Sequence, residues 1–458
     1  MSPHQYAQQN HPRFLTELKE LVSIPSVSTQ PQHNADVQHA ADWLTAKLEK
    51  IGMSAEQILM PKGRHPLVLG QWLEAGDEAP TVLIYGHYDV QPAEMADGWL
   101  TPPFEPTEKD GKLFGRGATD SKVNTMTQLK ALESLLQTDG RLPVNVKFII
   151  EGEEESGSEN INAFLDAHGD RLNADYGVIC DGGIVEPDQP SIVCGLRGIV
   201  TAELEVYGPS KDLHSGHYGG SIHNPIQALC EIIAQLHDEN GRVTVPGFYD
   251  NVRDFSPLER EDLAQIDPYF NQEWDNVAGA PAHWGEIGYS AHERTGIRPT
   301  LEINGIAGGY AAEGFKTVLP ATAHAKISCR LVANQDPVRI YQLLEKYINE
   351  LTPDTVMIKL TECDMGASAY LIDMSSHAVK TARQAYETHW GVPAIPEMAG
   401  GSVPITAALD PFVSEIVAMG FAHKAGQPHG PNENIILRNY ERAIATAITF
   451  LQTITKTG

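Results

Sequence analysis

Residues 81–89 read TVLIYGHYD, an apolar run of strand length that ends directly in a histidine and an aspartate. Two later runs have the same form: NVKFII at 145–150 leads into EGEEE, and YGVIC at 176–180 leads into an aspartate. Stretches near 121–137 and 159–169, which lie between these runs, have a helical pattern of apolar residues. Strands that alternate with helices predict an α/β fold, with a mainly parallel twisted sheet flanked by helices.

The pattern changes from about residue 198. TAELEVYG at 201–208 and TAHAKISCRLV at 322–332 alternate polar and apolar residues, which is typical of half-buried strands in an antiparallel sheet. Towards the C-terminus the α/β pattern returns. We therefore expect an α+β domain inserted into a discontinuous α/β domain. The expected ranges are 198–368 for the inserted domain, and 1–197 and 369–458 for the discontinuous one.

The composition argues against several kinds of partner. With 33 basic and 60 acidic residues the formal net charge is −27, so the surface should repel nucleic acid and anionic membranes. No apolar run reaches the ~20 residues that span a bilayer, and the first residues lack the pattern of a secretory signal. The five cysteines form no CxxC pair, which disfavours a disulfide framework and favours a cytoplasmic location.

Side chains of the kind that bind metals follow the three apolar runs. Ligands of open α/β sheets bind beyond the carboxyl ends of the strands, so these side chains should meet in one crevice. Two glycine-containing turns before helices, GRGATD at 115–120 and GQPHG at 426–430, carry further candidates. The candidates are His87, Asp89, Asp120, Glu154, Glu155, Asp181 and His429.

Each candidate also has a simpler interpretation. A histidine after a strand is commonly an ordinary loop residue, a run of glutamates is commonly solvated, and an aspartate before a helix is commonly an N-cap. Their joint occurrence in turns of one α/β layer favours a shared metal site. Imidazole and carboxylate ligands without thiolate suit Zn²⁺ or Mn²⁺, and a carboxylate can bridge two ions ~3.5–4 Å apart. One of the adjacent Glu154 and Glu155 could then stay off the metals as a base, and Asp89 could orient the imidazole of His87.

Seven motifs together resemble a known group of enzymes. They are TVLIYGHYDVQP, GRGATDSK, FIIEGEEESGSE, DLHSGHYGG, CRLVAN, GGSVP and HGPNEN, and they extend in order over nearly the whole chain. The chain resembles the di-metal aminopeptidase-like/aminoacylase superfamily of peptidases. The sequences of its motifs are most similar to those of the branch that contains carnosinase and the cytosolic non-specific dipeptidases.

The resemblance implies two divalent metal ions per chain, with Zn²⁺ as the first expectation and Mn²⁺ as the alternative. Asp120 would bridge both ions. His87 and Asp181 would complete one site, and Glu155 and His429 would complete the other.

The resemblance also implies the catalytic and substrate-binding roles. Glu154 would be the general base that takes a proton from a bridging water and returns it to the leaving amine, while Asp89 supports His87. His214 would stabilise the oxyanion in the site of the partner subunit, which implies a homodimer formed through the inserted lid domain. The residues expected to hold the carboxylate end of the substrate are Arg330, Ser402 and, from the partner, Thr317.

The chain departs from the family pattern after Asp120, where an acid or asparagine and then Lys-Gly is usual. Here Ser121, Lys122 and Val123 follow, so the lysine is kept and its neighbours differ, and Ser121 is expected to cap the next helix. The sequence leaves open whether the peptide after Asp120 is cis, as it often is in the family. The segment 246–299 is expected to shape the lid or the substrate pocket.

The expected activity is metal-dependent hydrolysis of dipeptides. An N-acyl amino-acid deacylase on the same scaffold would use the same metals and base, so ligand spacing leaves that alternative open. A non-catalytic binding protein with the same fold is a more distant alternative, because it would require the loss of a ligand or of the base, and every position is filled.

Overall fold

The computed structural model describes residues 1–364, 366, 368–401 and 404–455. The chain divides into two compact units, which are described separately below. The first comprises Met1–Cys194, Ile372–Pro396 and Ala408–Gly458, and the second comprises Gly195–Leu371 and Glu397–Ala407. The stretch 397–407, which the expected boundaries place in the discontinuous domain, thus groups with the second unit.

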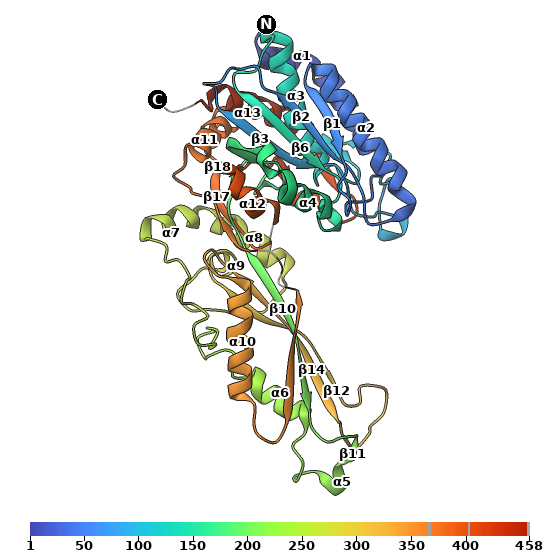
Figure 1. The fold of residues 1–458 in the computed structure, drawn as a ribbon, viewed down its shortest axis with the longest axis vertical. Helices are drawn as coiled ribbons and strands as arrows, with labels where there is room; N and C mark the ends of the chain where they lie inside the picture. Colours follow the sequence, from blue (N-terminus) through green and yellow to red (C-terminus); the bar gives the residue numbers. More distant parts are fainter. Residues whose placement is uncertain (365, 367, 402–403, 456–458) are drawn as a thin grey trace. The chain divides into compact units, whose positions relative to one another are not determined.

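The first unit is built on a twisted mixed sheet (Figure 1). Its strands follow the order β1-β2-β6-β3-β7-β18-β9, and the central pairs β6–β3, β3–β7 and β7–β18 are parallel. The strands are β1 (Ser54–Ile58), β2 (Leu67–Trp72), β3 (Thr81–His87), β6 (Asn145–Glu151), β7 (Ala174–Ile179), β9 (Ser191–Leu196) and β18 (Val413–Ala418). β3 and β6 are buried over nearly their full length, as apolar parallel strands covered on both faces must be. The predicted α/β class with a mainly parallel central sheet is confirmed.

Helices cover this sheet. They are α1 (Pro3–Val22), α2 (Asn34–Ile51), α3 (Lys122–Asp139), α4 (Glu159–His168), α11 (His377–Trp390) and α13 (Leu437–Thr453). α1 and α13 pack against α3, and α2 packs against β1 and β2 (Figure 1). α3 is buried on all sides from Lys122 to Leu135, so it lies inside the unit rather than on its surface. Its C-cap Gly140 has a φ of 67°, the left-handed conformation that commonly ends a helix.

The second unit contains an antiparallel sheet with helices on it, as the alternating sequence predicts. Its strand order is β12-β14-β10-β15, from β10 (Gly198–Tyr207), β12 (Thr300–Gly308), β14 (Thr322–Leu331) and β15 (Met357–Asp364). Burial alternates along the whole of β10, and the buried face packs against α6 (Pro225–Ile233) and α10 (Pro337–Leu351). The small pair β11 (Leu213–His214) and β13 (Val318–Leu319) adjoins α5 (Ser215–Tyr218). Segment 246–299 forms α7 (Pro257–Leu263), α8 (Asp267–Val277) and α9 (Ala291–Gly296).

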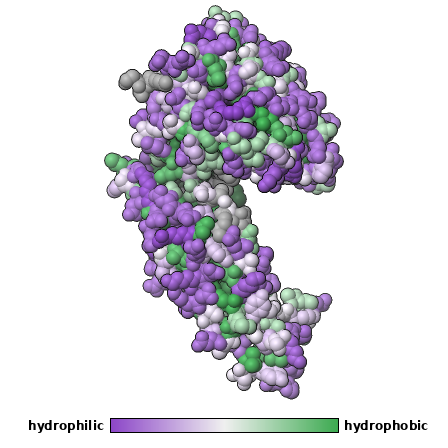
Figure 2. All heavy atoms as spheres, in the orientation of Figure 1, coloured by the Kyte–Doolittle hydropathy of each residue, from purple (hydrophilic) through white to green (hydrophobic). Residues whose placement is uncertain are grey.

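Short elements complete the described chain. They are β4 (Thr107–Lys109), β5 (Lys112–Phe114), β8 (Gly183–Ile184), β16 (Tyr370–Leu371), β17 (Ile395–Ala399), α12 (Pro404–Leu409), β19 (Ala422–His423) and β20 (Asn434–Ile436). β20 pairs with β5, which brings the chain before α13 next to the chain before α3. Figure 2 shows that hydrophilic residues dominate the visible face of the first unit. Within the described residues, no helix combines the length and apolarity needed to cross a membrane.

Candidate active site

The sheet of the first unit delivers three of the predicted ligands to one edge. His87 is the last residue of β3, Glu155 lies in the short 3₁₀ turn after β6, and Asp181 follows β7. These strands are parallel, so their carboxyl ends meet at the same edge. Asp120 immediately precedes α3, and His429 lies in the loop before β20. The structure brings all five predicted ligands together in two groups.

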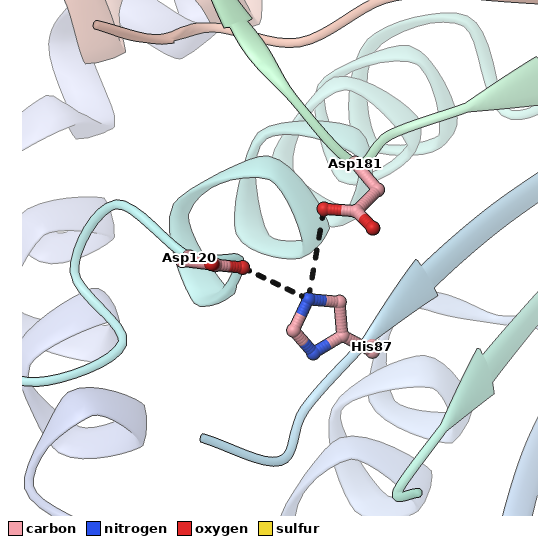
Figure 3. A group of neighbouring side chains, drawn as sticks. All are labelled: His87, Asp120 and Asp181. Carbon is pink, nitrogen blue, oxygen red and sulfur yellow. Dashed lines mark hydrogen bonds and ion pairs between the residues drawn. The ribbon is translucent and has the colours of Figure 1, made fainter. Parts of the chain in front are cut away.

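His87, Asp120 and Asp181 form the first group, and their side chains point toward one another in Figure 3. The Nε2 atom of His87 lies 3.2 Å from Asp120 Oδ1 and 3.7 Å from Asp181 Oδ1. Burial alone lowers the pKa of His87, but its carboxylate neighbours, led by Asp120, raise that pKa well above its ordinary value. The imidazole therefore sits in a strongly negative environment.

Asp120, Glu155 and His429 form the second group. The Nε2 atom of His429 lies 3.0 Å from Asp120 Oδ2 and 3.4 Å from Glu155 Oε2. Hydrogen bonds to Asp120 and Glu155 raise the pKa of His429 to about 10. Asp120 thus presents one carboxylate oxygen to each group, which is the arrangement of a bridging ligand.

The residues present fit a pair of divalent cations. In each group the candidate ligand atoms lie within 4.8 Å of one another. The donors are carboxylate oxygens and imidazole nitrogens, the set that Zn²⁺ and Mn²⁺ accept. Glu155 Oε1 is buried and has no hydrogen-bond partner among the described residues, so an acceptor remains to be satisfied there. The carboxylates also outnumber the imidazoles, and cations would balance that excess of negative charge.

Asp89 connects the turn that carries the candidate base, Glu154, to the proposed ligand His87. Its fully buried carboxylate accepts hydrogen bonds from the amides of Glu154 (3.2 Å) and Glu155 (3.0 Å) and from the hydroxyl of Ser28 (2.6 Å). His87 Nδ1 lies 3.1 Å from the backbone oxygen of Asp89 and 3.4 Å from its carboxylate. The backbone of Asp89 therefore contributes to the orientation of the ring, and its side chain mainly fixes the turn that carries the two glutamates.

Glu154 lies outside both ligand groups, in contrast to Glu155. Burial raises the pKa of Glu154 to about 9, and the negative charges of Asp181 and Glu155 act in the same direction. Cations held by the two ligand groups would oppose this shift and keep the carboxylate ionised, as a general base must be before it accepts a proton.

Ser121 does not cap α3 with its side chain, contrary to expectation. Its hydroxyl instead donates to the carbonyl oxygen of Cys180 (3.0 Å), and the side-chain amide of Asn124 donates to that of Gly182 (3.0 Å). These two bonds hold the start of α3 to the backbone on either side of Asp181. The peptide between Asp120 and Ser121 is cis.

Lys122 is fully buried directly after this turn. Its Nζ donates to the carbonyl oxygens of Leu21 (2.9 Å) and Ile24 (2.7 Å), at the C-terminal end of α1. Burial lowers the pKa of Lys122 to about 7. The lysine thus connects the turn that carries Asp120 to the end of the N-terminal helix.

The sequence reasoning missed two buried charged residues of this site, Arg116 and Glu433. Their side chains form an ion pair of 2.7 Å, with 3% and 0% of the side chains exposed. Both lie inside motifs quoted above, GRGATDSK and HGPNEN. The available signal was therefore a charged residue in each of two glycine- or asparagine-rich turns that also carry a ligand.

In the second unit, His214 and Thr317 are neighbours. Both are exposed, and the amide of Ser215 donates to the carbonyl oxygen of Thr317 (3.1 Å). The Nδ1 atom of His214 accepts a hydrogen bond from the amide of Gly216 (3.0 Å), so the ring hydrogen of a neutral His214 is on Nε2. The rings of His214 and His217 meet edge to face, with their centroids 4.7 Å apart.

Arg330 lies near the other end of this sheet, where it pairs with Ile199 of β10. The adjacent Arg197 is buried and donates to the carbonyl oxygens of Gly400 and Gly401. Burial, followed by the like charge of Arg330, lowers the pKa of Arg197 to about 10. Ser402, the remaining predicted substrate residue, lies outside the described residues.

Comparison with known proteins adds independent information. The family model described as peptidase family M20/M25/M40 matches residues 83–453. The Cys-Gly metallodipeptidase dug1 of Schizosaccharomyces pombe is 30% identical over 456 residues, which cover 96% of this chain and 94% of that protein. The Beta-Ala-His dipeptidase of Rattus norvegicus is 31% identical over 456 residues, covering 95% and 92%. The solved structure of the M20 family metallo-carboxypeptidase Sso-CP2 from Sulfolobus solfataricus matches with a TM-score of 0.79 and 30% identity, covering 96% and 98% of the two chains.

Proposed function

Because the chain belongs to peptidase family M20/M25/M40, we propose that it is a metal-dependent dipeptidase that cleaves unblocked dipeptides. The observation that carries the proposal is the pair of ligand groups that share Asp120, with the half-buried Glu154 next to Glu155. Dug1 is named for Cys-Gly and the rat relative for Beta-Ala-His. We extend the substrate class, a dipeptide, to this chain, and we leave the side chains of the substrate open.

The proposed ligands are His87, Asp120 and Asp181 for one ion, and Asp120, Glu155 and His429 for the other. When bound, two such ions polarise a substrate carbonyl and lower the pKa of a water. Zn²⁺ is the first expectation and Mn²⁺ the second, because the ligands are imidazoles and carboxylates.

Glu154 is the proposed general base. It takes a proton from the attacking water and delivers it to the nitrogen of the leaving amine. The hydrogen bonds from the amides of Glu154 and Glu155 to Asp89 hold this turn in place, so the base can stay close to the ligands without binding an ion itself. General base catalysis of this kind typically contributes ~10²–10⁴-fold.

Arg330 is proposed to bind the free carboxylate of the substrate, together with Ser402. A guanidinium pairs with a carboxylate through two parallel hydrogen bonds, which makes it selective for that group. The buried Arg197 supports the proposal, because it adds positive charge near Arg330 and holds the carbonyl groups of Gly400 and Gly401, directly before Ser402.

His214 is proposed to act on the substrate of the partner subunit, with Thr317. Eight residue steps of β14 separate Thr322 from Arg330, which is roughly 26 Å at ~3.3 Å per residue. His214 lies beyond the Thr322 end, at the tip that carries α5 (Figure 1). An extended dipeptide spans only ~7 Å, so a substrate held by Arg330 cannot reach His214 of the same chain. The Nε2 hydrogen of a neutral His214 would be free to stabilise an oxyanion.

The second unit is accordingly proposed to be the lid and dimerisation domain, and the first the catalytic domain. β12 is an edge strand of the four-stranded sheet, and edge strands are available for pairing with another chain. Exposed apolar side chains occur on β12 and in the chain after it (Ile306, Tyr310 and Phe315), and in α5 and just after it (Tyr218 and Ile222). A cytoplasmic location is proposed because no disulfide joins the five cysteines, all of which lie within the described residues.

The test is hydrolysis of a substrate panel by protein reconstituted with Zn²⁺ or Mn²⁺. The panel contains free dipeptides, the same dipeptides with an added third residue, and N-acyl amino acids. We expect cleavage of the dipeptides, loss of activity with EDTA, and recovery on adding metal. Cleavage of the N-acyl amino acids alone would instead make the chain a deacylase. No hydrolysis of any compound by fully loaded protein would contradict the proposal.

A further inference from the structure

The two segments that carry Asp120 and His429 are joined through a buried ion pair. Arg116 lies four residues before Asp120, and Glu433 lies four residues after His429. The Nη1 atom of Arg116 donates to Glu433 Oε2 over 2.7 Å. In the same guanidinium, Nη2 donates to the carbonyl oxygen of His429 over 2.9 Å. Arg116 thus holds its partner carboxylate and the backbone of a proposed ligand at the same time.

The carboxylate of Glu433 organises the opposite segment. Its Oε2 atom also accepts the amide of Gly117 (2.9 Å), and Oε1 accepts the amides of Thr119 (2.7 Å) and Asp120 (2.9 Å). Each oxygen therefore receives two hydrogen bonds. Three of the four come from backbone between Arg116 and α3, so one side chain determines the path of the loop that ends in Asp120.

Burial of this pair is difficult to explain by stability alone. Replacing a buried ion pair by apolar residues is often neutral or stabilising, so such a pair is weak evidence for a stabilising role. Here both carboxylate oxygens of Glu433 accept backbone amides of the segment that ends in Asp120. The main chain adds a further link, from the amide of Gly115 to the carbonyl oxygen of Glu433 (3.0 Å).

We propose that Arg116 and Glu433 are positioning residues that set the separation of Asp120 and His429, and thereby the affinity for the two metal ions. This inference rests on the proposed function. Glu433 acts through the amide of Asp120, and Asp120 contributes to both ion sites. Arg116 acts on the carbonyl group of His429, and His429 contributes to only one of the two ion sites. The two residues should therefore have different effects on the two ions.

The test compares the metal affinities of Glu433→Gln and Arg116→Lys with that of the unmodified chain. A glutamine has one oxygen and one NH₂ group in place of the two carboxylate oxygens. The NH₂ group would face either the donors of Arg116 and Gly117 or the amides of Thr119 and Asp120, and it cannot accept a hydrogen bond from them. We expect Glu433→Gln to weaken both ions by ~10–100-fold, the usual cost of losing a residue that orients metal ligands. A lysine cannot hold Glu433 and His429 in one fork, so Arg116→Lys should weaken mainly one ion.

The measurement is competition for Zn²⁺ against a chromophoric chelator, with the absorption spectrum of the Co²⁺-loaded protein as a second readout. Glu17→Gln is the matched control, because Glu17 is a buried carboxylate in an ion pair with Lys130, away from both ligand groups. It should lower the thermal stability of the metal-free protein and leave metal affinity unchanged. Excess metal should restore the turnover of Glu433→Gln, as it would not if that carboxylate took part in catalysis.

The outcomes separate this inference from the proposed function. If the unmodified chain binds fewer than two ions, both fail. If it binds two ions and Glu433→Gln binds them with the same affinities, only the positioning role is wrong. Equal weakening by Glu17→Gln would also overturn it, because the effect would then follow from general destabilisation. Should Glu433→Gln fail to fold, Arg116→Lys, which retains the charge, takes its place. Metal affinities of Arg116→Lys equal to those of the unmodified chain would then show that the positioning role is wrong.

Discussion

The proposal that His214 of one subunit acts in the active site of the other can be tested by mixing two inactive variants. Glu154→Gln removes the proposed base, and His214→Ala removes the proposed oxyanion donor. Each homodimer should be nearly inactive, since one oxyanion donor typically contributes ~10²–10³-fold and one general base ~10²–10⁴-fold. In a mixed dimer, the site that retains Glu154 receives an intact His214 from the other chain, while the second site lacks both groups.

The expected recovery follows from this geometry. Random exchange of equal amounts gives mixed dimers as about half of the population, and one of their two sites is complete, so turnover should reach about a quarter of the unmodified value. The ~26 Å between the two ends of β14 argues against the alternative in which His214 and Arg330 of one chain hold the same dipeptide. In that alternative every site of a mixed dimer would lack one group, and no activity would return.

The assay follows dipeptide hydrolysis after the variants have been mixed, and purification through two different tags isolates the mixed dimers. Each variant mixed with itself is the control. Tagged mixed dimers that contain a full set of metal ions but stay inactive would refute action of His214 in the partner subunit. An inability of the chains to form any dimer at protein concentrations at which the unmodified chain is active would refute it equally.

Further expectations concern single variants and substrates. Glu154→Gln should retain both ions, measured by metal analysis, while turnover falls ~10²–10⁴-fold; a loss of metal with surviving activity would reverse the roles within the glutamate pair. Asp120→Ala should lose both ions and His87→Ala mainly one, so equal losses would contradict the bridging role. Amidation of the substrate C-terminus should raise KM strongly, because Arg330 would be left without its carboxylate; equal rates for the amide and the acid would argue against that contact. Burial raises the pKa of Glu17, but its interactions with Lys130 and Lys47 outweigh burial and lower that pKa to about 2 from an ordinary value of 4.5. The stability that Glu17 contributes should therefore be lost as the pH falls from about 4.5 to 2, and Glu17→Gln should flatten that part of a plot of unfolding free energy against pH.

The sequence contained most of the information on the strands and the ligands. Apolar runs of strand length predicted β3, β6 and β7 because parallel strands covered on both faces need continuous apolar sequence. The residues that follow such strands lie at one edge, which is why His87 and Asp181 could be predicted to meet. The resemblance to a peptidase superfamily, read from seven motifs, is confirmed by the family model that matches residues 83–453.

Other features could not be predicted, because they depend on contacts between distant segments. The hydroxyl of Ser121 has both a helix N-terminus and the carbonyl group of Cys180 within reach, and only the folded structure shows that it bonds the latter. The role of Glu433 was equally hidden, since its four partners lie more than 300 positions earlier in the sequence. A motif indicates that a residue matters, whereas its contacts require the three-dimensional fold.

The buried ammonium group of Lys122 has a consequence for shortened forms of the protein. Its acceptors are carbonyl groups of Leu21 and Ile24, contributed by the first helix of the chain. A protease cut that removes this helix, or an expression product that starts after it, would leave a cation without acceptors two residues from Asp120. A buried cation without partners is strongly unfavourable. The N-terminal helix is therefore an integral support of the metal-binding edge, although its sequence carries no ligand, and it should not be trimmed when the protein is produced for crystallisation.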